Sequence, residues 1–184
     1  NGTGLARHAL LPGEEAGLAV AWQLDGKVVA AGYCQNGAYY EFFAARYNTD
    51  GSPDGSFGAG GRALVHINDI ALCSAVQVQA DGKIVLAGDT YDAQGRTRFA
   101  VARLNADGTA DNGFGLNGTA TAAFNSVEDH ATCLVIQPDG RIVVAGTSFI
   151  SNNSDMSVAR FTSTGGLDPT FDGDGKAVVS FGST

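Results

Sequence analysis

The chain has 184 residues, of which 26 are glycine, 4 are proline and 16% are charged. This composition is typical of a soluble, turn-rich single domain, and a formal net charge of −8 without a local lysine or arginine cluster disfavours nucleic acid and anionic membranes as partners. No apolar run is long enough for a membrane-spanning helix or a signal sequence. Because the first residue is Asn1 and not Met, we expect a processed or excised piece.

One strand-like segment occurs three times along the chain. It reads DGKVVAAG at 25–32, DGKIVLAG at 81–88 and DGRIVVAG at 139–146. Two later sets of anchors, the arginines and the phenylalanines, recur at a constant interval of about 57 residues. They are Arg46, Arg103 and Arg160, and Phe57, Phe114 and Phe171. The sequence therefore predicts three equivalent structural units.

Each unit is expected to contain four strands and no helix, as its third copy shows best. Apolar alternation and β-branched residues predict strands at 131–137, 141–146, 156–162 and 176–181. The first two flank Pro138-Asp139-Gly140, which is typical of a tight hairpin turn. A polar loop is expected before the third strand, and a glycine-rich turn before the fourth.

Small residues occupy matching places on the first strand of each unit and favour a radial arrangement, because small side chains let three backbones approach a common axis. They are Gly17 and Ala19, Cys73 and Ala75, and Ala131 and Cys133. The expected fold is all-β and of the β-propeller type, with three four-stranded blades of about 57 residues in one repeat domain. A β-sandwich is the alternative. The expected units are 11–67, 68–124 and 125–181, preceded by an extra outer strand within 1–10.

The repeats resemble the delta-60 repeat family of bacterial cell-surface and secreted proteins, whose units are expected to form propeller blades. The stretches VQVQADGKIVLAGDT and RFAVARLNADGTADNGFGLNG carry the resemblance, which covers nearly the whole chain. The matching positions are Gln137, Pro138, Asp139, Gly140, Arg103, Asn105, Asp107, Gly108, Asp111, Phe114 and Gly115. The chain departs from the pattern at Leu24, Ala80 and Asp172. The resemblance implies a fold, an extracellular or cell-surface (or periplasmic) location, and little about chemistry.

Three blades are fewer than the four to eight that usually close a propeller ring. The ring could keep a gap, close by unusual geometry or form a three-sheet prism. We expect instead that another copy of the chain joins it, giving a dimer with six blades, in which each N-terminal strand supplies or displaces an outer strand of the other copy.

The residue types present predict no metal site and no cofactor. The Asp- and Asn-rich turns NTDGSPDG and NADGTADN lack the closing glutamate of a calcium loop, so their side chains are expected to cap backbone N–H groups. His130 and Cys133 lack the further ligands of a zinc site. The aspartates found in every copy, Asp54, Asp111 and Asp168, are expected to pair with the repeated arginines, and the repeated phenylalanines to pack between sheets. These nine residues are interpreted as structural.

The candidate binding site is the aromatic loop YCQNGAYYEFF at 33–43, which differs from the other copies. Its candidate residues are Tyr33, Tyr39, Tyr40 and Phe42. Clustered aromatic rings beside polar groups bind protein anchors and sugar faces, although these rings could simply cover an edge strand. The favoured function is a non-catalytic, self-assembling module for protein or glycan binding.

The alternative function is a hydrolase or lyase with acidic and histidine residues at the channel mouth, where Glu14, Glu15, Asp69, Asp129 and His130 are expected. The three cysteines leave at least one free thiol. Cys73 and Cys133 are interpreted as small packing residues, and a bridge from Cys34 to either stays open.

Overall fold

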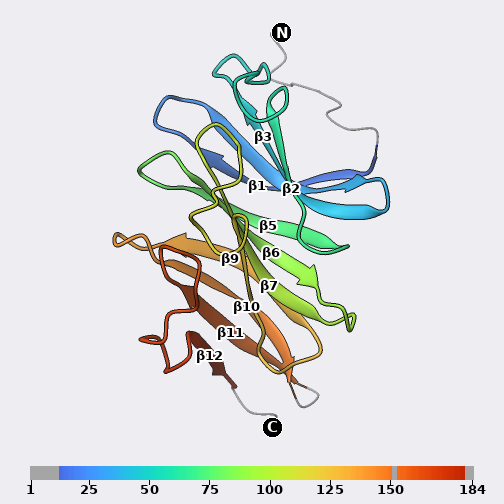
Figure 1. The fold of residues 1–184 in the computed structure, drawn as a ribbon, viewed down its shortest axis with the longest axis vertical. Coiled ribbons are helices and arrows are strands. Elements are labelled where there is room, and N and C mark those ends of the chain that lie inside the picture. The colour runs from blue at the N-terminus through green and yellow to red at the C-terminus, as the bar shows by residue number, and fades with distance from the viewer. Residues whose placement is uncertain (1–12, 151–152, 181–184) are drawn as a thin grey trace.

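The computed structural model describes residues 13–150 and 153–180, and these residues form twelve β-strands and no helix. The extra outer strand expected within residues 1–10 lies outside this range. The strands form three four-stranded antiparallel sheets, each built from four consecutive strands (Figure 1). We call the sheets blades 1, 2 and 3. The all-β prediction and the three four-stranded sheets are confirmed.

Each blade contains three long strands and a short outer one. Blade 1 consists of β1 (Glu15–Trp22), β2 (Val28–Asn36), β3 (Tyr39–Tyr47) and β4 (Arg62–Val65). Blade 2 consists of β5 (Ala71–Val78), β6 (Ile84–Tyr91), β7 (Thr97–Leu104) and β8 (Thr119–Ala122). Blade 3 consists of β9 (Asp129–Ile136), β10 (Ile142–Ile150), β11 (Asn153–Phe161) and β12 (Lys176–Val179).

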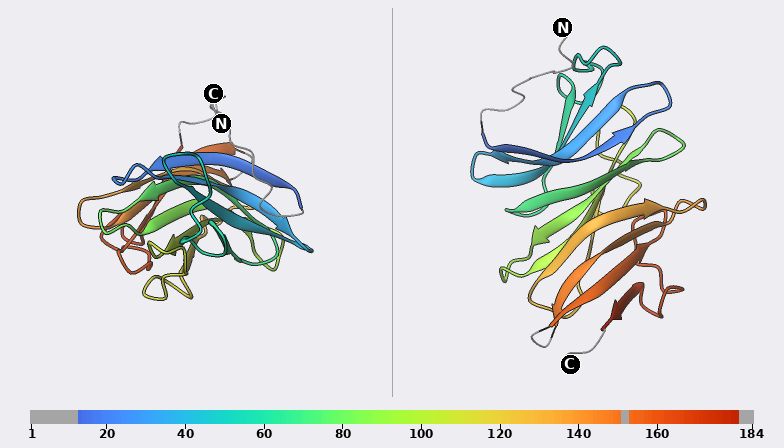
Figure 2. Two further views of the ribbon diagram at one scale, coloured as in Figure 1. Left: turned by 90° about the horizontal axis from the view of Figure 1, so that it is seen from above. Right: turned by 180° about the vertical axis from the view of Figure 1, so that it is seen from behind.

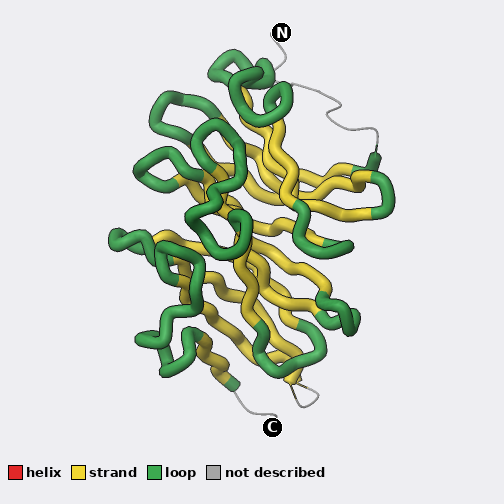
Figure 3. Tube along the Cα trace, viewed as in Figure 1, coloured by secondary structure: helices red, strands yellow, loops and turns green. Residues whose placement is uncertain are grey.

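The blades follow one another along the long axis of the molecule, with blade 1 at the N-terminal end and blade 3 at the C-terminal end (Figure 2). The first strands β1, β5 and β9 lie next to one another. The described chain consists of strands joined by loops and turns (Figure 3). Among the described residues, one apolar core joins blades 1 and 2 and another joins blades 2 and 3. A three-sheet prism would need a third core between blades 1 and 3.

A β-bulge interrupts each first strand at the place where the sequence has its small residues. The strand pairing shifts between Gly17 and Ala19, and again between Cys73 and Ala75. The glycine of the repeated Ala-Gly dipeptide faces this bulge on the second strand. A Cβ atom on Gly88 would overlap the carbonyl oxygen of Leu72, and equivalent overlaps occur in the other two blades. The small residues and this glycine therefore accommodate one local distortion.

The hairpin turn after each first strand has the predicted Asp-Gly chemistry. In blade 3 the Gln137 N–H donates to the Arg141 carbonyl at 2.8 Å and the Gly140 N–H donates to the Gln137 carbonyl at 2.9 Å. The Asp139 carboxylate accepts from the Arg141 N–H at 3.1 Å. Asp25 and Asp81 make the same contact in their blades, so one turn geometry serves all three.

The expected loop between the second and third strands of blade 3 is wrong, because β10 and β11 continue through it and pair from Ile142 with Phe161 out to Ile150 with Asn153. The same holds in blade 1, where β2 and β3 pair as far as Asn36 with Tyr39. The polar side chains in these segments led to the prediction of a loop. They are compatible with strands because the solvent-facing side of a hairpin tip does not need apolar residues.

Candidate functional site

The repeated arginine, aspartate and phenylalanine form one compact cluster in each blade. The Arg103 Nε donates to Asp111 Oδ2 at 2.6 Å, and the guanidinium carbon lies 4.6 Å from the centre of the Phe114 ring. Arg46 makes the same two contacts with Asp54 and Phe57, and Arg160 makes them with Asp168 and Phe171. We call each set an Arg-Asp-Phe anchor.

The anchors of blades 1 and 2 also hold the next blade in place. Arg46 Nη1 donates to the Ala106 carbonyl at 2.5 Å, and Arg103 Nη1 donates to the Ser163 carbonyl at 2.7 Å. The residue after each phenylalanine adds a backbone contact to the following blade, at 2.7 Å for Gly58 and 2.8 Å for Gly115. The anchors of blades 1 and 2 therefore each tie a strand to its own turn and to the next blade.

The aspartates of the anchors are held ionised. Burial raises the pKa of Asp111, but hydrogen bonds from Lys83, the Gly113 N–H and Arg103 outweigh it and bring the pKa to about 2. Asp168 has a pKa of about 2 because Thr170 and Arg141 donate to it. The three aspartates are buried, and each pairs with the arginine of its own unit. Their structural role stays a prediction.

The aromatic residues of blade 1 lie on the β2–β3 hairpin and not in a loop. The rings of Tyr33 and Tyr40 meet edge to face with centroids 6.0 Å apart, and Tyr39 meets the ring of His66 in the same way at 4.9 Å. Tyr39 is 44% exposed. Phe42 is fully buried in the core between blades 1 and 2, so it is not part of a surface site.

Glu41 lies behind the Tyr39 and His66 rings and was not predicted from the sequence. Its carboxylate accepts from Asn36 Nδ2 at 3.0 Å and lies 3.2 Å from His66 Nδ1. Glu41 itself is buried, whereas half of the His66 side chain is exposed. The position of Glu41 next to two tyrosines could have identified it in the sequence. That it faces His66 is known only from the structure. We call Tyr39, His66, Glu41 and Asn36 the aromatic site.

Tyr40 extends the same hairpin edge towards the chain segment before β1. Its hydroxyl donates to Glu14 Oε2 at 3.4 Å, and the negative charge of Glu14 raises the Tyr40 pKa. The Tyr40 N–H donates to the Asp69 carbonyl at 3.0 Å. The tyrosine therefore joins blade 1 to the loop before blade 2 and is only partly available to a ligand.

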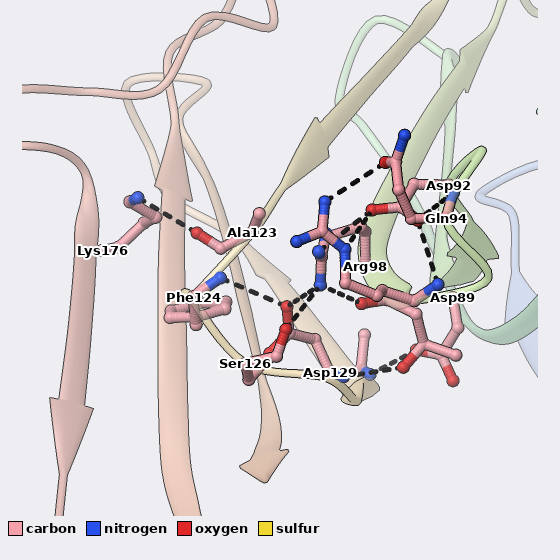
Figure 4. A network of polar contacts seen from close by, with 12 residues as sticks. Asp89, Asp92, Gln94, Arg98, Ala123, Phe124, Ser126, Asp129 and Lys176 are labelled. Carbon is pink, nitrogen blue, oxygen red and sulfur yellow. Dashed lines mark hydrogen bonds and ion pairs between the residues drawn. The ribbon is translucent and has the colours of Figure 1, made fainter. Parts of the chain in front are cut away.

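The residues expected at the channel mouth have different partners in the structure. Asp129 is fully buried in a polar network between β7 and the loop before β9 (Figure 4). Its carboxylate accepts from Ser126 Oγ and from the Phe124 N–H, and it lies 3.4 Å from Arg98 Nη1. Asp129 is therefore a packing and pairing group. Glu15 is exposed on β1.

His130 has one carboxylate partner, Asp89 on β6, at 2.8 Å from its Nδ1. Burial raises the pKa of Asp89, although hydrogen bonds from His130 and the Ala131 N–H oppose this effect. The sequence did not single out Asp89, because the other copies have Tyr33 and Thr147 at that place. No group of three or more histidine, cysteine or acidic residues able to hold a metal occurs within residues 13–150 and 153–180.

A hollow of about 760 Å³ lies at one end of the inner strands, where β1, β5 and β9 run into their turns. Its wall includes Val20, Trp22, Val76, Gln77 and Pro138. Val20 and Trp22 are 68% and 63% exposed, so apolar side chains border this hollow. The hollow contains no charged pair suited to acid-base chemistry.

All three thiols are free in the structure. Cys34 and Cys73 are buried, and burial raises their pKa values to about 11 and about 12. Cys73 packs in the core between blades 1 and 2 as a small apolar residue, while Cys133 is exposed.

Equivalent four-stranded blades with adjacent first strands define a β-propeller-type repeat protein. A family model described as "Domain of unknown function (DUF5122) beta-propeller" matches residues 23–57, 79–114 and 137–171. These segments make up more than half of the chain, and the chain belongs to this family. No curated protein matches it significantly. In the part of the chain that the structure describes, no helix is long and apolar enough to cross a membrane.

Proposed function

We propose that this chain is a non-catalytic propeller module of the delta-60 type, secreted or held at the cell surface or in the periplasm, that binds a glycan or a protein and assembles with a second copy. The aromatic site is the observation that carries the binding function. It combines an exposed tyrosine face with hydrogen-bonding groups, the arrangement that binds sugar rings and protein anchors. Neither of the other two blades has these residues at its corresponding hairpin.

The chemistry of the aromatic site favours a glycan. The exposed Tyr39 ring offers an apolar face to the C–H groups of a sugar, and the neighbouring His66 imidazole and Asn36 amide can exchange hydrogen bonds with its hydroxyls. Glu41 already bonds to both polar groups, which fixes their orientation before a ligand arrives. Preorganised polar groups beside an aromatic ring reduce the entropy lost on binding.

A glycan array with the purified chain and its Tyr39→Ala variant tests this function. We expect the wild type to retain a defined set of glycans and the variant to lose binding by tenfold or more. Tyr91→Ala is the matched control, since Tyr91 occupies the end of β6 in blade 2 and lies outside the aromatic site. Equal binding by the wild type and Tyr39→Ala would refute the glycan function. So would a wild type that binds no glycan on the array.

A second candidate is a hydrolase or lyase, and the contact between His130 and Asp89 is the observation that favours it. A histidine oriented by a carboxylate can act as a general base. Against it, Asp129 is already bound by Arg98 and Ser126, and Asp69 belongs to the contact with Tyr40. Turnover of any substrate that disappears in His130→Ala but not in Tyr39→Ala would favour the enzyme over the binding module.

A further inference from the structure

The outward faces of blades 1 and 3 differ, and each has groups that lack the partners found between neighbouring blades in the described structure. On blade 3, the face that continues the array is apolar and uncovered. Met156 and Val179 are 43% and 40% exposed, whereas the equivalent residues of blade 2, Phe99 and Ala122, are 0% and 2% exposed because blade 3 covers them. An exposed apolar face that another blade covers elsewhere in the same chain indicates a missing neighbour.

In the described structure, the arginine of the blade 3 anchor makes no hydrogen bond to a further blade and is more exposed than its two counterparts. Arg160 bonds to Asp168 and Thr170, but within residues 13–150 and 153–180 no carbonyl accepts from its Nη1. Its side chain is 19% exposed, against 8% for Arg46 and 7% for Arg103. Phe171 is half-buried although its counterparts are fully buried.

The Asp172 N–H corresponds to the backbone donors that follow the phenylalanine of the other two anchors. Asp172 has φ 50°, nearly the same as Gly58 at 52° and Gly115 at 54°. Those two glycines donate their N–H groups to carbonyls of the next blade, while no acceptor for the Asp172 N–H occurs among the described residues. We call Met156, Val179, Arg160, Phe171 and Asp172 the donor face of blade 3.

Blade 1 presents the matching acceptors at the opposite end of the array. By the repeat register, Thr49 and Asp50 correspond to Ala106 and Asp107, whose carbonyls accept from the anchor of blade 1. In the described part of the chain, no donor reaches the carbonyls of Thr49 and Asp50, and both residues are exposed. Blade 1 therefore presents the kind of acceptor pair that the donors of blade 3 lack.

A hollow of about 420 Å³ lies beside these carbonyls, lined by Gly26, Val28, Tyr47, Asn48, Thr49 and Gly51. At the matching place on blade 2, a Cβ atom on Gly108 would lie 2.9 Å from the Phe57 ring, and the same place on blade 3 touches Phe114. The hollow is therefore the position at which a preceding blade would seat its phenylalanine. We call Val28, Thr49, Asp50 and Gly51 the acceptor face of blade 1.

We propose that the donor face of one copy binds the acceptor face of a second copy, and that the two reciprocal contacts close a six-bladed ring. Phe171 fills the hollow beside Gly51, Arg160 Nη1 donates to the Thr49 carbonyl, and the Asp172 N–H donates to the Asp50 carbonyl. Two copies give six blades, which falls within the usual range of about four to eight, whereas three copies would give nine. This contact specifies the self-assembly in the proposed function and rests on it.

Light scattering and sedimentation of the full chain test the contact. We expect twice the monomer mass at micromolar concentration for the wild type. Met156→Arg on the donor face and Val28→Arg on the acceptor face should each give a monomer, with at least a tenfold weaker association. Both positions are partly exposed in one copy, so each long side chain can reach water and the fold should persist.

Val127→Arg is the matched control, because Val127 is 61% exposed in the loop before β9 and belongs to neither face. If Met156→Arg alone fails to fold by circular dichroism, Val179→Arg replaces it. Loss of association in the donor-face variant only would indicate a contact between two donor faces and would overturn the proposal. So would a wild type that stays monomeric, or a dimer that survives both substitutions.

The glycan array on the same samples separates the two proposals. A monomeric chain that still binds glycans through Tyr39 refutes the ring and leaves the binding function intact. A dimer that responds to Met156→Arg and Val28→Arg but binds no glycan supports the ring and removes the glycan function.

Discussion

Replacing Phe114 with alanine should cost far more stability than making the same change at Phe171. Phe114 is 0% exposed between blades 2 and 3, and the Arg103 guanidinium covers its ring at 4.6 Å. Burying a phenylalanine side chain contributes about 1.5–3 kcal/mol, and an enclosed cavity brings the usual cost of Phe→Ala to about 3–5 kcal/mol. Losing the cation–π contact adds about 0.5–1 kcal/mol. We expect Phe114→Ala to lower the free energy of unfolding by about 4 kcal/mol.

Phe171 is half-buried in one copy and borders open solvent, so its removal leaves no closed cavity. The expected cost of Phe171→Ala in a dilute, monomeric sample is about 1–2 kcal/mol. Urea unfolding followed by circular dichroism measures both, and with a slope of about 2 kcal/mol/M the midpoint should fall by about 2 M for Phe114→Ala and by less than about 1 M for Phe171→Ala. Equal losses in the dilute sample would refute the account of the anchor. Because a partner that binds only the folded chain stabilises it, the cost at Phe171 should rise with protein concentration.

Three further predictions concern acid, backbone space and thiols. The Asp111 pKa of about 2 lies below its unfolded value of about 3.9, so its stabilisation is present above that pH and is lost as the pH falls towards 2; the deficit of Asp111→Asn at neutral pH should shrink in acid unfolding curves. Gly88→Ala should cost about 3 kcal/mol in urea unfolding because its Cβ would overlap the bulge backbone, whereas Gly17→Ala, with open space around it, should cost under about 1 kcal/mol. A thiol reagent should modify exposed Cys133 at once and buried Cys73 only on unfolding, as mass spectrometry would show.

The repeat period was sufficient to predict the sheets, because every copy needs the same turn and the same first strand. The Asp139-Gly140 turn and the apolar residues that follow it define a hairpin by local chemistry alone. The repeated Arg103, Asp111 and Phe114 also indicated a shared packing role. Local interactions within one unit were therefore predictable from the sequence.

Interactions between units were less predictable, because they depend on which face of a strand meets the next blade. Phe42 is grouped with Tyr39 and Tyr40 in the sequence, yet its ring packs in the core between blades 1 and 2 and is fully buried. Asp129 was expected at a channel mouth, but it is buried with Arg98, a residue from a different strand. Neither placement could be read from sequence spacing without the strand register.

Equivalent residues of the three repeats also differ in their hydrogen-bond partners, because their blades have different neighbours. Arg46, Arg103 and Arg160 have similar local sequences, but within residues 13–150 and 153–180 only the first two donate from Nη1 to a carbonyl of the next blade. Asp172 has the left-handed backbone that glycine adopts in the other copies, and aspartate is one of the few residues with a Cβ atom that take up this conformation. In blades 1 and 2 this backbone conformation accompanies the N–H donation from Gly58 and Gly115 to the next blade. Blade 3 keeps the conformation although no acceptor for the Asp172 N–H occurs among the described residues, and this observation supports the proposed contact between its donor face and a second copy.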